Sequence, residues 1–430
     1  MTPDDLLDPL LQPGLKGFPH AHRAVRRSEV GQLGWHVLAG DLPLPVAVLR
    51  REALTHNIAW MQRRATRWGV GLAPHGKTTM SPQLFARQLD AGAWGITFAT
   101  VTQLAVGVAA GVRNALVANL VAADADLAQV QALRAAHPGL RVVFLVDSLA
   151  QLALVDAWFA AHPGADPFEV LLEVGVAGGR TGVRSSADAE ALAARLHASP
   201  AVRFAGVECY EGLGARGDSV ADGAYTTALM DRVEAIARRA DAAGWFDTDE
   251  VIVSAGGSAL YDLVAARLVP VLGRPVRGLL RSGCYVTHDH GFYRRMVHAV
   301  ERRLGCACDE TLRPALEVWA EVQSRPEPGL AIVAAGKRDL SFDLTMPFPL
   351  WHAPRGALSA SAAPAGWRID GLNDQHAYLR WDPADDAAAP AVGDRVGLGI
   401  SHPCTTFDKW AWMPVVEPDY RVCDAITTHF

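Results

Sequence analysis

Between residues 70 and 283, short apolar runs rich in β-branched residues alternate with stretches of helical spacing. This alternation favours a parallel sheet with crossover helices. Eight such units within about 250 residues match the size of a (β/α)8 barrel. A doubly wound open sheet stays possible at this point, because the number of strands does not show whether the sheet closes. The candidate strands are residues 70–76, 95–100, 115–119, 141–147, 168–174, 204–210, 251–257 and 276–283.

Two of the intervening stretches carry signals for the start of a helix. SPQLFARQLDAG (81–92) opens with Ser81 and Pro82, and SADAEALAARLHAS (186–199) opens with Ser186. A serine side chain can accept a hydrogen bond from the first turn, and proline is favoured at the first helical position. We therefore expect helices capped by these two serines.

The pattern changes at about residue 305. ALEVWAEVQSR, LAIVAAGKRDLSFD, AYLRWDP and GDRVGLGISHP are short candidate strands with turn residues and no helices between them. This texture predicts a smaller antiparallel β domain. We expect an α/β fold in which a TIM-like barrel spans residues 45–300 and the β domain comprises residues 305–430 together with 1–44.

The composition argues against several classes of protein. A net charge of −6 without a basic run makes nucleic acid an unexpected partner. The acidic, proline-broken start MTPDDLLDPLLQPG is unlike a signal peptide, and no apolar run is long enough to cross a membrane. The six cysteines are scattered, which is typical of a reduced cytoplasmic enzyme. Cys306 and Cys308 fit two separate thiols better than a metal site, because no second cluster lies nearby in the sequence.

Residues with chemical potential follow several of the candidate strands. Lys77 follows the first strand, Arg180 the fifth and Tyr210 ends the sixth, while the turns SAGGS and RSGCY end the seventh and eighth. In a barrel these positions meet at one face. Glycine-rich turns expose N–H groups to a phosphate, and a lysine can form a Schiff base with a phosphorylated aldehyde. Together they predict pyridoxal phosphate, although each motif alone also fits an ordinary turn or surface residue.

Lys77 raises a separate expectation, because it stands directly behind an apolar run in GLAPHGKTTM. We expect it to be buried, and a buried ammonium group is costly unless its charge is lost, paired or used chemically.

A second set of residues lies near the C-terminus in GISHPCTTFDKW (399–410). If this segment is extended, the alternate residues His402 and Cys404 point the same way. Imidazole and thiolate together favour Zn²⁺, and two protein ligands leave open positions, as in a catalytic site. The alternative is a coincidence of two unrelated side chains.

In this order the motifs resemble the D-serine dehydratase and D-threonine aldolase family of fold-type III pyridoxal-phosphate enzymes. The resemblance runs from PLPVAVLRREALTHNIAWM to SHPCTTFDKW, which is nearly the whole chain. APHGKTTMSP matches the family's lysine motif except that Ala73 replaces an arginine. EVGVAGGRTGV resembles the family's arginine motif, and SAGGS resembles its phosphate-binding turn. CTTFDKW differs from the sequence that usually follows the His-x-Cys pair in the family.

The resemblance implies an alanine racemase-like barrel, a β domain, a homodimer and pyridoxal 5'-phosphate as cofactor. It implies that Lys77 forms the Schiff base, that Arg180 approaches the phenolic oxygen and that Tyr210 lies beside the ring. Arg281 would face the pyridine nitrogen, with an ion pair at the barrel rim as the alternative. The phosphate would be held by Gly256, Gly257 and Ser258, with backbone groups of Gly283 and Cys284, and the metal by His402 and Cys404.

The implied substrate is a D-3-hydroxy amino acid such as D-serine, D-threonine or 3-hydroxy-D-aspartate. The softer ligand Cys404 favours zinc and a dehydratase that gives a 2-oxo acid and ammonia, because the family's aldolases tend to carry aspartate there. The alternative is a metal-activated aldolase that gives glycine and an aldehyde. A non-catalytic cofactor carrier is a third possibility, against which the β domain and the His-x-Cys pair argue. His352 and His376 are further candidates for the substrate pocket, or ordinary structural histidines.

Overall fold

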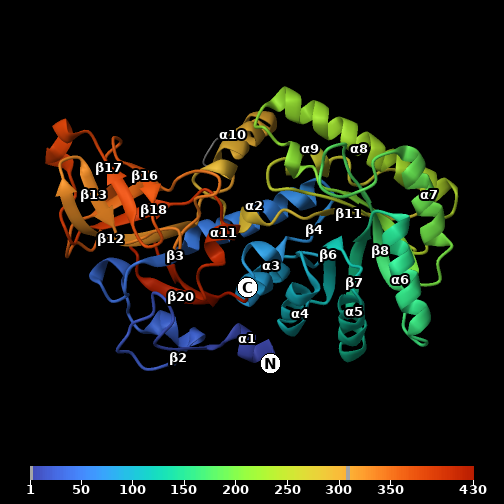
Figure 1. The fold of residues 1–430 in the computed structure, drawn as a ribbon, viewed down its shortest axis with the longest axis horizontal. Helices are drawn as coiled ribbons and strands as arrows, with labels where there is room; N and C mark the ends of the chain where they lie inside the picture. Colours follow the sequence, from blue (N-terminus) through green and yellow to red (C-terminus); the bar gives the residue numbers. More distant parts are fainter. Residues whose placement is uncertain (1–2, 307–309) are drawn as a thin grey trace.

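The computed structural model describes residues 3–306 and 310–430. Eight parallel strands form the larger sheet, in the spatial order β4-β11-β10-β9-β8-β7-β6-β5. Figure 1 shows these strands surrounded by helices on one side of the molecule, with the smaller β domain on the other. The strands are β4 (Gly71–Leu72), β5 (Ile96–Phe98), β6 (Asn114–Leu120), β7 (Arg141–Val146), β8 (Phe168–Val174), β9 (Val202–Cys209), β10 (Val251–Ala255) and β11 (Val276–Leu280).

Backbone hydrogen bonds join the two ends of this order and close the sheet. The Trp94 N–H donates to the Leu72 carbonyl at 2.7 Å, and the Thr97 N–H donates to the Pro74 carbonyl at 2.8 Å. The predicted barrel is therefore confirmed, and the open doubly wound sheet is wrong.

Alternate residues of the strands fill the barrel and cover its outside. Leu116, Val143, Leu145 and Ile252 belong to a small cluster inside the barrel, which also contains Ala73. The neighbours of these residues along the strands belong to the large cluster under the helices. This is the expected result of side chains that alternate along a strand. Ala73, which stands where the family's lysine motif has an arginine, therefore lies inside the barrel.

Helices follow the strands in the predicted rhythm. The helix α3 begins at Pro82, and the Ser81 hydroxyl accepts from the Leu84 N–H, as expected. The helix α7 is capped one residue earlier than predicted, because the Ser185 hydroxyl accepts from the Asp188 N–H at 3.0 Å. The helices from α2 onward are α2 (Arg51–Arg67), α3 (Pro82–Asp90), α4 (Val101–Ala109), α5 (Asp124–Ala136), α6 (Leu149–Ala161), α7 (Ser186–His197), α8 (Ser219–Ala242), α9 (Tyr261–Ala265), α10 (Phe292–Leu304) and α11 (Cys404–Phe407).

The β domain is built around the long strand β12 (Leu316–Glu327). It pairs with β18 (Arg395–Gly399), β13 (Leu330–Val333) and β3 (Val46–Arg50), in each case antiparallel. The strand β3 also pairs with β19 (Trp412–Val416), so the chain enters the barrel's first helix from a strand of the other sheet. The predicted domain division stays a prediction. The remaining strands are β14 (Phe348–Ala353), β15 (Ser361–Ala362), β16 (Arg368–Leu372), β17 (Ala377–Arg380), β19 (Trp412–Val416) and β20 (Val422–Thr427).

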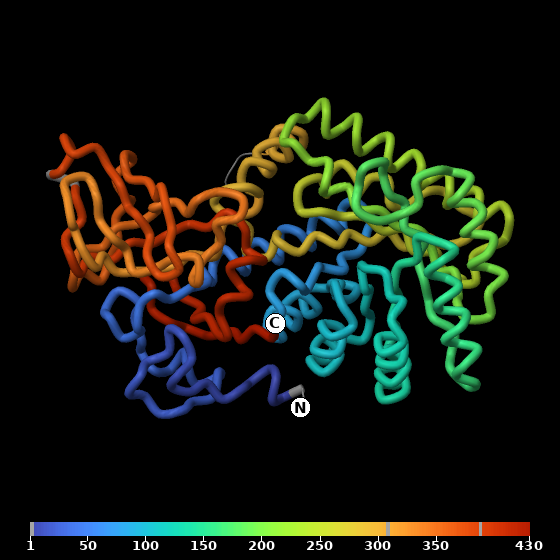
Figure 2. The backbone as a smooth tube through the Cα atoms, viewed as in Figure 1, coloured from blue at the N-terminus to red at the C-terminus, as the bar shows by residue number. Residues whose placement is uncertain are grey.

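The two ends of the chain lie close together beside α3, as Figure 2 shows. The N-terminal segment contains α1 (Pro3–Leu7), β1 (Leu10–Leu11) and β2 (Val25–Arg26). The Gln83 side chain of α3 donates to the Leu6 carbonyl and to the Thr427 hydroxyl. The His429 N–H donates to the Met80 carbonyl at 2.9 Å. Both end segments therefore hold the turn that leads from Lys77 into α3. No helix of the described ranges is long and apolar enough to cross a membrane.

Ser185→Ala removes the acceptor at the start of α7, so we expect it to lower the free energy of unfolding by about 1 kcal/mol. Ser186→Ala is the matched control and should change stability little, because alanine is the better helix former. Urea denaturation followed by tryptophan fluorescence measures both. A larger loss for Ser186→Ala would place the cap where the sequence predicted it.

Candidate active site

A cavity of about 360 Å³ lies at the carboxyl ends of the barrel strands. Its walls combine residues that follow β4, β8, β9, β10 and β11 with residues of the β domain. All the residues that the resemblance assigned to the cofactor and the metal line this cavity: Lys77, Arg180, Tyr210, Gly256, Gly257, Ser258, Arg281, Gly283, Cys284, His402 and Cys404. The structure thus brings them together, whereas their roles stay predictions.

The expectation that Lys77 is buried is wrong. The strand β4 ends at Leu72, and Lys77 lies in the following short 3-10 turn, Gly76–Thr78. The chain has left the barrel wall by this point, so the Lys77 side chain is exposed at the cavity while Gly76 and Thr78 are buried. The turn is fixed and the amine is accessible.

The glycine turn after β10 binds a carboxylate that the sequence did not predict. The N–H groups of Gly256 and Gly257 donate to the Glu211 carboxylate at 3.0 and 2.7 Å. Burial raises the pKa of Glu211, and these two N–H groups oppose that rise. A Cβ atom at Gly256 would come within 2.6 Å of the Arg281 backbone nitrogen, so the close approach requires glycine. The structure therefore places a carboxylate on two amides that were predicted to hold a phosphate.

Other donors remain at the same turn. In the described part of the chain, the N–H groups of the buried residues Ser258 and Gly283 have no hydrogen-bond acceptor. The Cys284 N–H donates to the Ser258 hydroxyl at 3.1 Å and joins the two loops. A Cβ atom at Gly283 would come within 2.6 Å of the His75 carbonyl oxygen. Buried N–H groups in glycine-rich loops fit a phosphate group.

Arg281 forms a buried ion pair beneath the cavity. One guanidinium nitrogen lies 2.6 Å from the Glu208 carboxylate, and the group also donates to the Ser254 hydroxyl and the Cys209 carbonyl. The Arg281 and Glu208 side chains are 3% and 0% exposed, so this is no ion pair at the rim. Burial raises the pKa of Glu208 to about 7, against the attraction of Arg281.

Arg180 and Tyr210 lie side by side at the opening. Arg180 is exposed, and its guanidinium carbon lies 5.2 Å from the centre of the Tyr210 ring, within the range of a cation–π contact. Burial raises the pKa of Tyr210 to about 12, so the phenol is neutral at physiological pH.

The His402 and Cys404 side chains reach the cavity by a different local structure from the one expected. The strand β18 ends at Gly399 and α11 begins at Cys404, so the segment is not extended. The His402 Nδ1 lies 2.5 Å from the Asp343 carboxylate, which leaves Nε2 for another partner. The Cys404 Sγ lies 3.7 Å from the Cys284 Sγ and 3.5 Å from the Thr78 hydroxyl. A carboxylate on the far nitrogen is the usual support of a metal-binding histidine, so the pair fits a soft divalent ion.

No group of three His, Cys, Asp or Glu side chains in residues 3–306 and 310–430 is already gathered as a metal site.

Sequence reasoning missed four residues that line the cavity, namely Thr78, Glu173, Glu208 and Tyr293. It also missed Glu211 and Asp343, which bind the lining residues Gly256 and His402. A signal existed for two of them, because Glu173 and Glu208 interrupt the apolar strands FEVLLEV and FAGVECY. Glu211 and Asp343 gave none, since both stand in irregular polar segments.

The other candidates lie elsewhere. The His352 Nε2 lies 2.8 Å from the Asp394 carboxylate in the β domain, and His376 is exposed between β16 and β17. Neither lines the cavity. The Cys306 thiol accepts from Arg64, and Cys308 lies outside the described residues.

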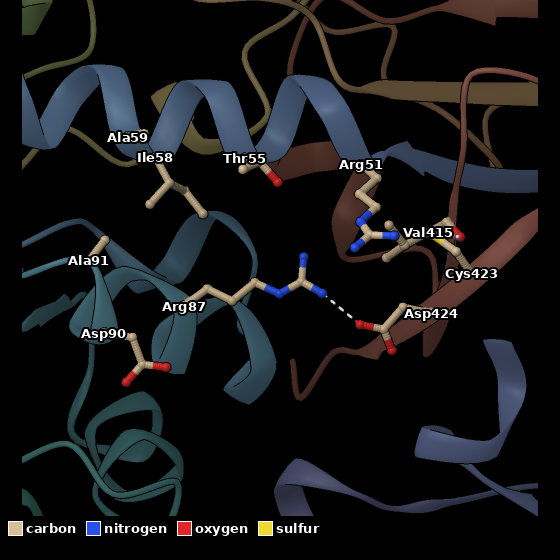
Figure 3. A pocket seen from close by; sticks show the side chains of 10 residues that line it. All are labelled: Arg51, Thr55, Ile58, Ala59, Arg87, Asp90, Ala91, Val415, Cys423 and Asp424. Carbon is tan, nitrogen blue, oxygen red and sulfur yellow. Dashed lines mark hydrogen bonds and ion pairs between the residues drawn. The ribbon is translucent and has the colours of Figure 1, made fainter.

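A second cavity, of about 470 Å³, lies between α2, α3 and β20 (Figure 3). Its arginines are paired: Arg87 lies 2.6 Å from Asp424, and Arg51 lies 2.6 Å from Glu417. Their charge is thus balanced by acidic neighbours, and the chemistry concentrates in the cavity at the strand ends.

The buried Glu208 makes stability depend on pH. Its pKa is higher in the folded protein than the ordinary value of 4.5, so folding favours the protonated form. This contribution is fully present below about pH 4.5 and is lost as the pH rises to about 7. The free energy of unfolding of wild type minus that of Glu208→Gln should therefore fall across this range in denaturation experiments. A constant difference would show that Glu208 does not titrate there.

Models of two known families match separate segments of the chain. The alanine racemase N-terminal domain matches residues 49–268, and the putative serine dehydratase domain matches residues 315–416. The chain is 30% identical to the D-threo-3-hydroxyaspartate dehydratase of Delftia sp. strain HT23 over 385 residues, covering 85% of this chain and 92% of that protein. It is 28% identical to the D-threonine aldolase of Arthrobacter sp. over 374 residues, covering 87% and 89%.

Solved structures of the same kinds of enzyme resemble this chain in fold. The crystal structure of D-threonine aldolase from Filomicrobium marinum superposes with a TM-score of 0.76 at 24% identity, covering 92% of this chain and 97% of the other. The Delftia dehydratase superposes with a TM-score of 0.68 at 26% identity, covering 90% and 98%. With the matched domains and the geometry of the strand-end cavity, these likenesses show that the chain belongs to the D-serine dehydratase and D-threonine aldolase family of fold-type III pyridoxal-phosphate enzymes.

Proposed function

We propose that this protein is a pyridoxal-phosphate-dependent lyase that removes the β-hydroxyl of a D-3-hydroxy amino acid and releases a 2-oxo acid and ammonia. One observation carries the proposal: an accessible lysine and a supported His–Cys pair, from opposite ends of the chain, line one cavity. Relatives named as a D-threo-3-hydroxyaspartate dehydratase and as D-threonine aldolase support the class of substrate.

The cofactor would be held by residues of the barrel. When bound, pyridoxal phosphate supplies an electron sink that makes the α-proton of an amino acid acidic. The Lys77 Nζ is the accessible amine that would hold the cofactor and that, once released by the substrate amine, would accept the α-proton. Because Gly256 and Gly257 donate to Glu211, we assign the phosphate chiefly to the N–H groups of Ser258 and Gly283.

The surrounding charges would orient the ring. Arg281 is fixed by Glu208 and Ser254, so it presents a permanent cation at the cavity floor, where the pyridine nitrogen is expected. A cation at that position keeps the nitrogen unprotonated. Arg180 would approach the phenolic oxygen, and the neutral Tyr210 would lie beside the ring.

The β domain would supply the metal site. Zinc on His402 and Cys404 supplies a Lewis acid for a leaving hydroxyl group. Asp343 holds Nδ1 of His402 and so directs Nε2 to the ion. The Cys404 thiol lies next to Thr78, which directly follows Lys77, so the proposed proton acceptor and the proposed metal ligand would face one substrate from adjoining parts of the cavity. The thiolate favours zinc over harder divalent ions, and the family resemblance associates a cysteine at this position with the dehydratase branch.

The homodimer and the cytoplasmic location that the sequence led us to expect remain part of this proposal, on the basis of the family resemblance.

Borohydride reduction of the holoenzyme should attach the cofactor permanently to the peptide that contains Lys77. The reagent reduces the imine between the cofactor aldehyde and the lysine amine to a stable C–N bond. Lys77→Ala should lose the mass increase, the cofactor absorbance and turnover together. Lys337→Ala, which changes an exposed lysine of the β domain, is the control and should keep all three. Peptide mass spectrometry reads the result, and a labelled peptide in Lys77→Ala would remove Lys77 from this role.

Incubation with D-serine, D-threonine and 3-hydroxy-D-aspartate in the presence of zinc should release ammonia and a 2-oxo acid in equal amounts. The alternative activity is an aldolase, favoured by the relative of that name, and it would release glycine and an aldehyde instead. Scoring ammonia and glycine in the same sample separates the two. Glycine without ammonia would contradict the dehydratase and support the aldolase.

A further inference from the structure

Two cysteines from different domains meet at the cavity. Cys284 is the first residue of a 3-10 turn that follows β11, and Cys404 is the first residue of α11 in the β domain. Their sulfur atoms lie 3.7 Å apart, and both side chains line the cavity. Only Cys404 belongs to the His-x-Cys pair described above, so the role of the Cys284 thiol is unassigned.

The separation of the sulfurs matches a shared metal ion. Two thiolates that each lie about 2.3 Å from a tetrahedral zinc ion are about 3.8 Å apart. The Nε2 atom of His402 is the third donor, because Asp343 binds the other ring nitrogen. One imidazole and two thiolates are a donor set that zinc prefers to harder ions.

Cys284 is also held in place. Its N–H donates to the Ser258 hydroxyl, and it is 5% exposed. The Thr78 hydroxyl lies 3.8 Å from the Cys284 sulfur and 3.5 Å from the Cys404 sulfur, so one threonine contacts both thiols. The three side chains are not yet gathered around one point, and closing on an ion requires rotation of side chains within the cavity.

We propose that Cys284 is a third protein ligand of the metal, together with His402 and Cys404. The inference rests on the metal of the proposed function and adds a ligand from the barrel. Three protein ligands leave one position of a tetrahedral ion open for a substrate oxygen, as in catalytic zinc sites. The ion would then join the two domains at the cavity, next to the turn that carries Lys77.

Cobalt substitution tests the number of thiolate ligands directly. The holoenzyme is stripped of metal, kept under reductant and loaded with Co²⁺, and the thiolate-to-cobalt charge-transfer absorption is measured. We expect Cys284→Ser and Cys404→Ser each to lose roughly half of the wild-type intensity, and the double variant to lose all of it, since each thiolate contributes separately. Cys423→Ser is the control, because that thiol contacts the Val415 carbonyl beside the second cavity.

Zinc affinity gives a second measurement. Competition with a chromophoric chelator should show that Cys284→Ser weakens zinc binding by about 10-fold to 100-fold or more. Loss of a residue that only hydrogen-bonds to a metal ligand already costs this much affinity. Cys284→Ala is measured as well, because alanine has no donor atom, whereas a serine oxygen can bind the metal in place of the sulfur. Retained cofactor absorbance in each variant shows that the barrel and its phosphate loop are intact.

The outcomes separate this inference from the proposed function. If Cys404→Ser loses intensity but Cys284→Ser and Cys284→Ala match wild type in both measurements, the two thiols are only in contact and the third ligand is overturned. If wild type shows no thiolate-to-cobalt absorption, the metal role of Cys404 falls as well. The borohydride label on Lys77 is independent of both results, so the role of Lys77 is tested separately.

Discussion

One of the backbone hydrogen bonds between the domains joins the two loops that carry the two halves of the site. The N–H of His290, in the loop after the last barrel strand, donates to the Ile400 carbonyl at 2.9 Å. Two residues later that second segment carries His402, and then Cys404. Gly291 permits the approach, because a Cβ atom there would come within 2.9 Å of the Ser401 Cβ. The cavity therefore depends on two loops that lie far apart in the sequence and touch through their backbones.

The barrel and the location of the site could be predicted from the sequence. The run at 168–174 coincides with β8, and 141–147 differs from β7 by one residue, because fully buried parallel strands appear as unbroken apolar runs. The residues at the carboxyl ends then had to converge, since parallel strands in a closed barrel all end at the same face.

Features that depend on contacts distant in the sequence could not be predicted. The strand β3 belongs to the β domain through partners such as β12, which the chain reaches only after the whole barrel. Lys77 was expected to be buried because the length of its strand was overestimated. The Glu211 carboxylate accepts from the N–H of Gly256, which belongs to another loop, and no local sequence pattern predicts a contact between two loops. The cap of α7 was missed by one residue because two serines stand side by side.

The division of labour between the two loops has an evolutionary consequence. The β18–α11 segment is held to the barrel by the main-chain carbonyl of Ile400 and by the Cys404 side chain, which lies beside Thr78. Exchange of residues in this segment can alter which bond of a substrate is labile, while the barrel keeps the electron-withdrawing half of the chemistry unchanged. In such an architecture, substitutions in one short segment can change the reaction, and CTTFDKW is the part of this segment that differs from the pattern of the family that the chain resembles.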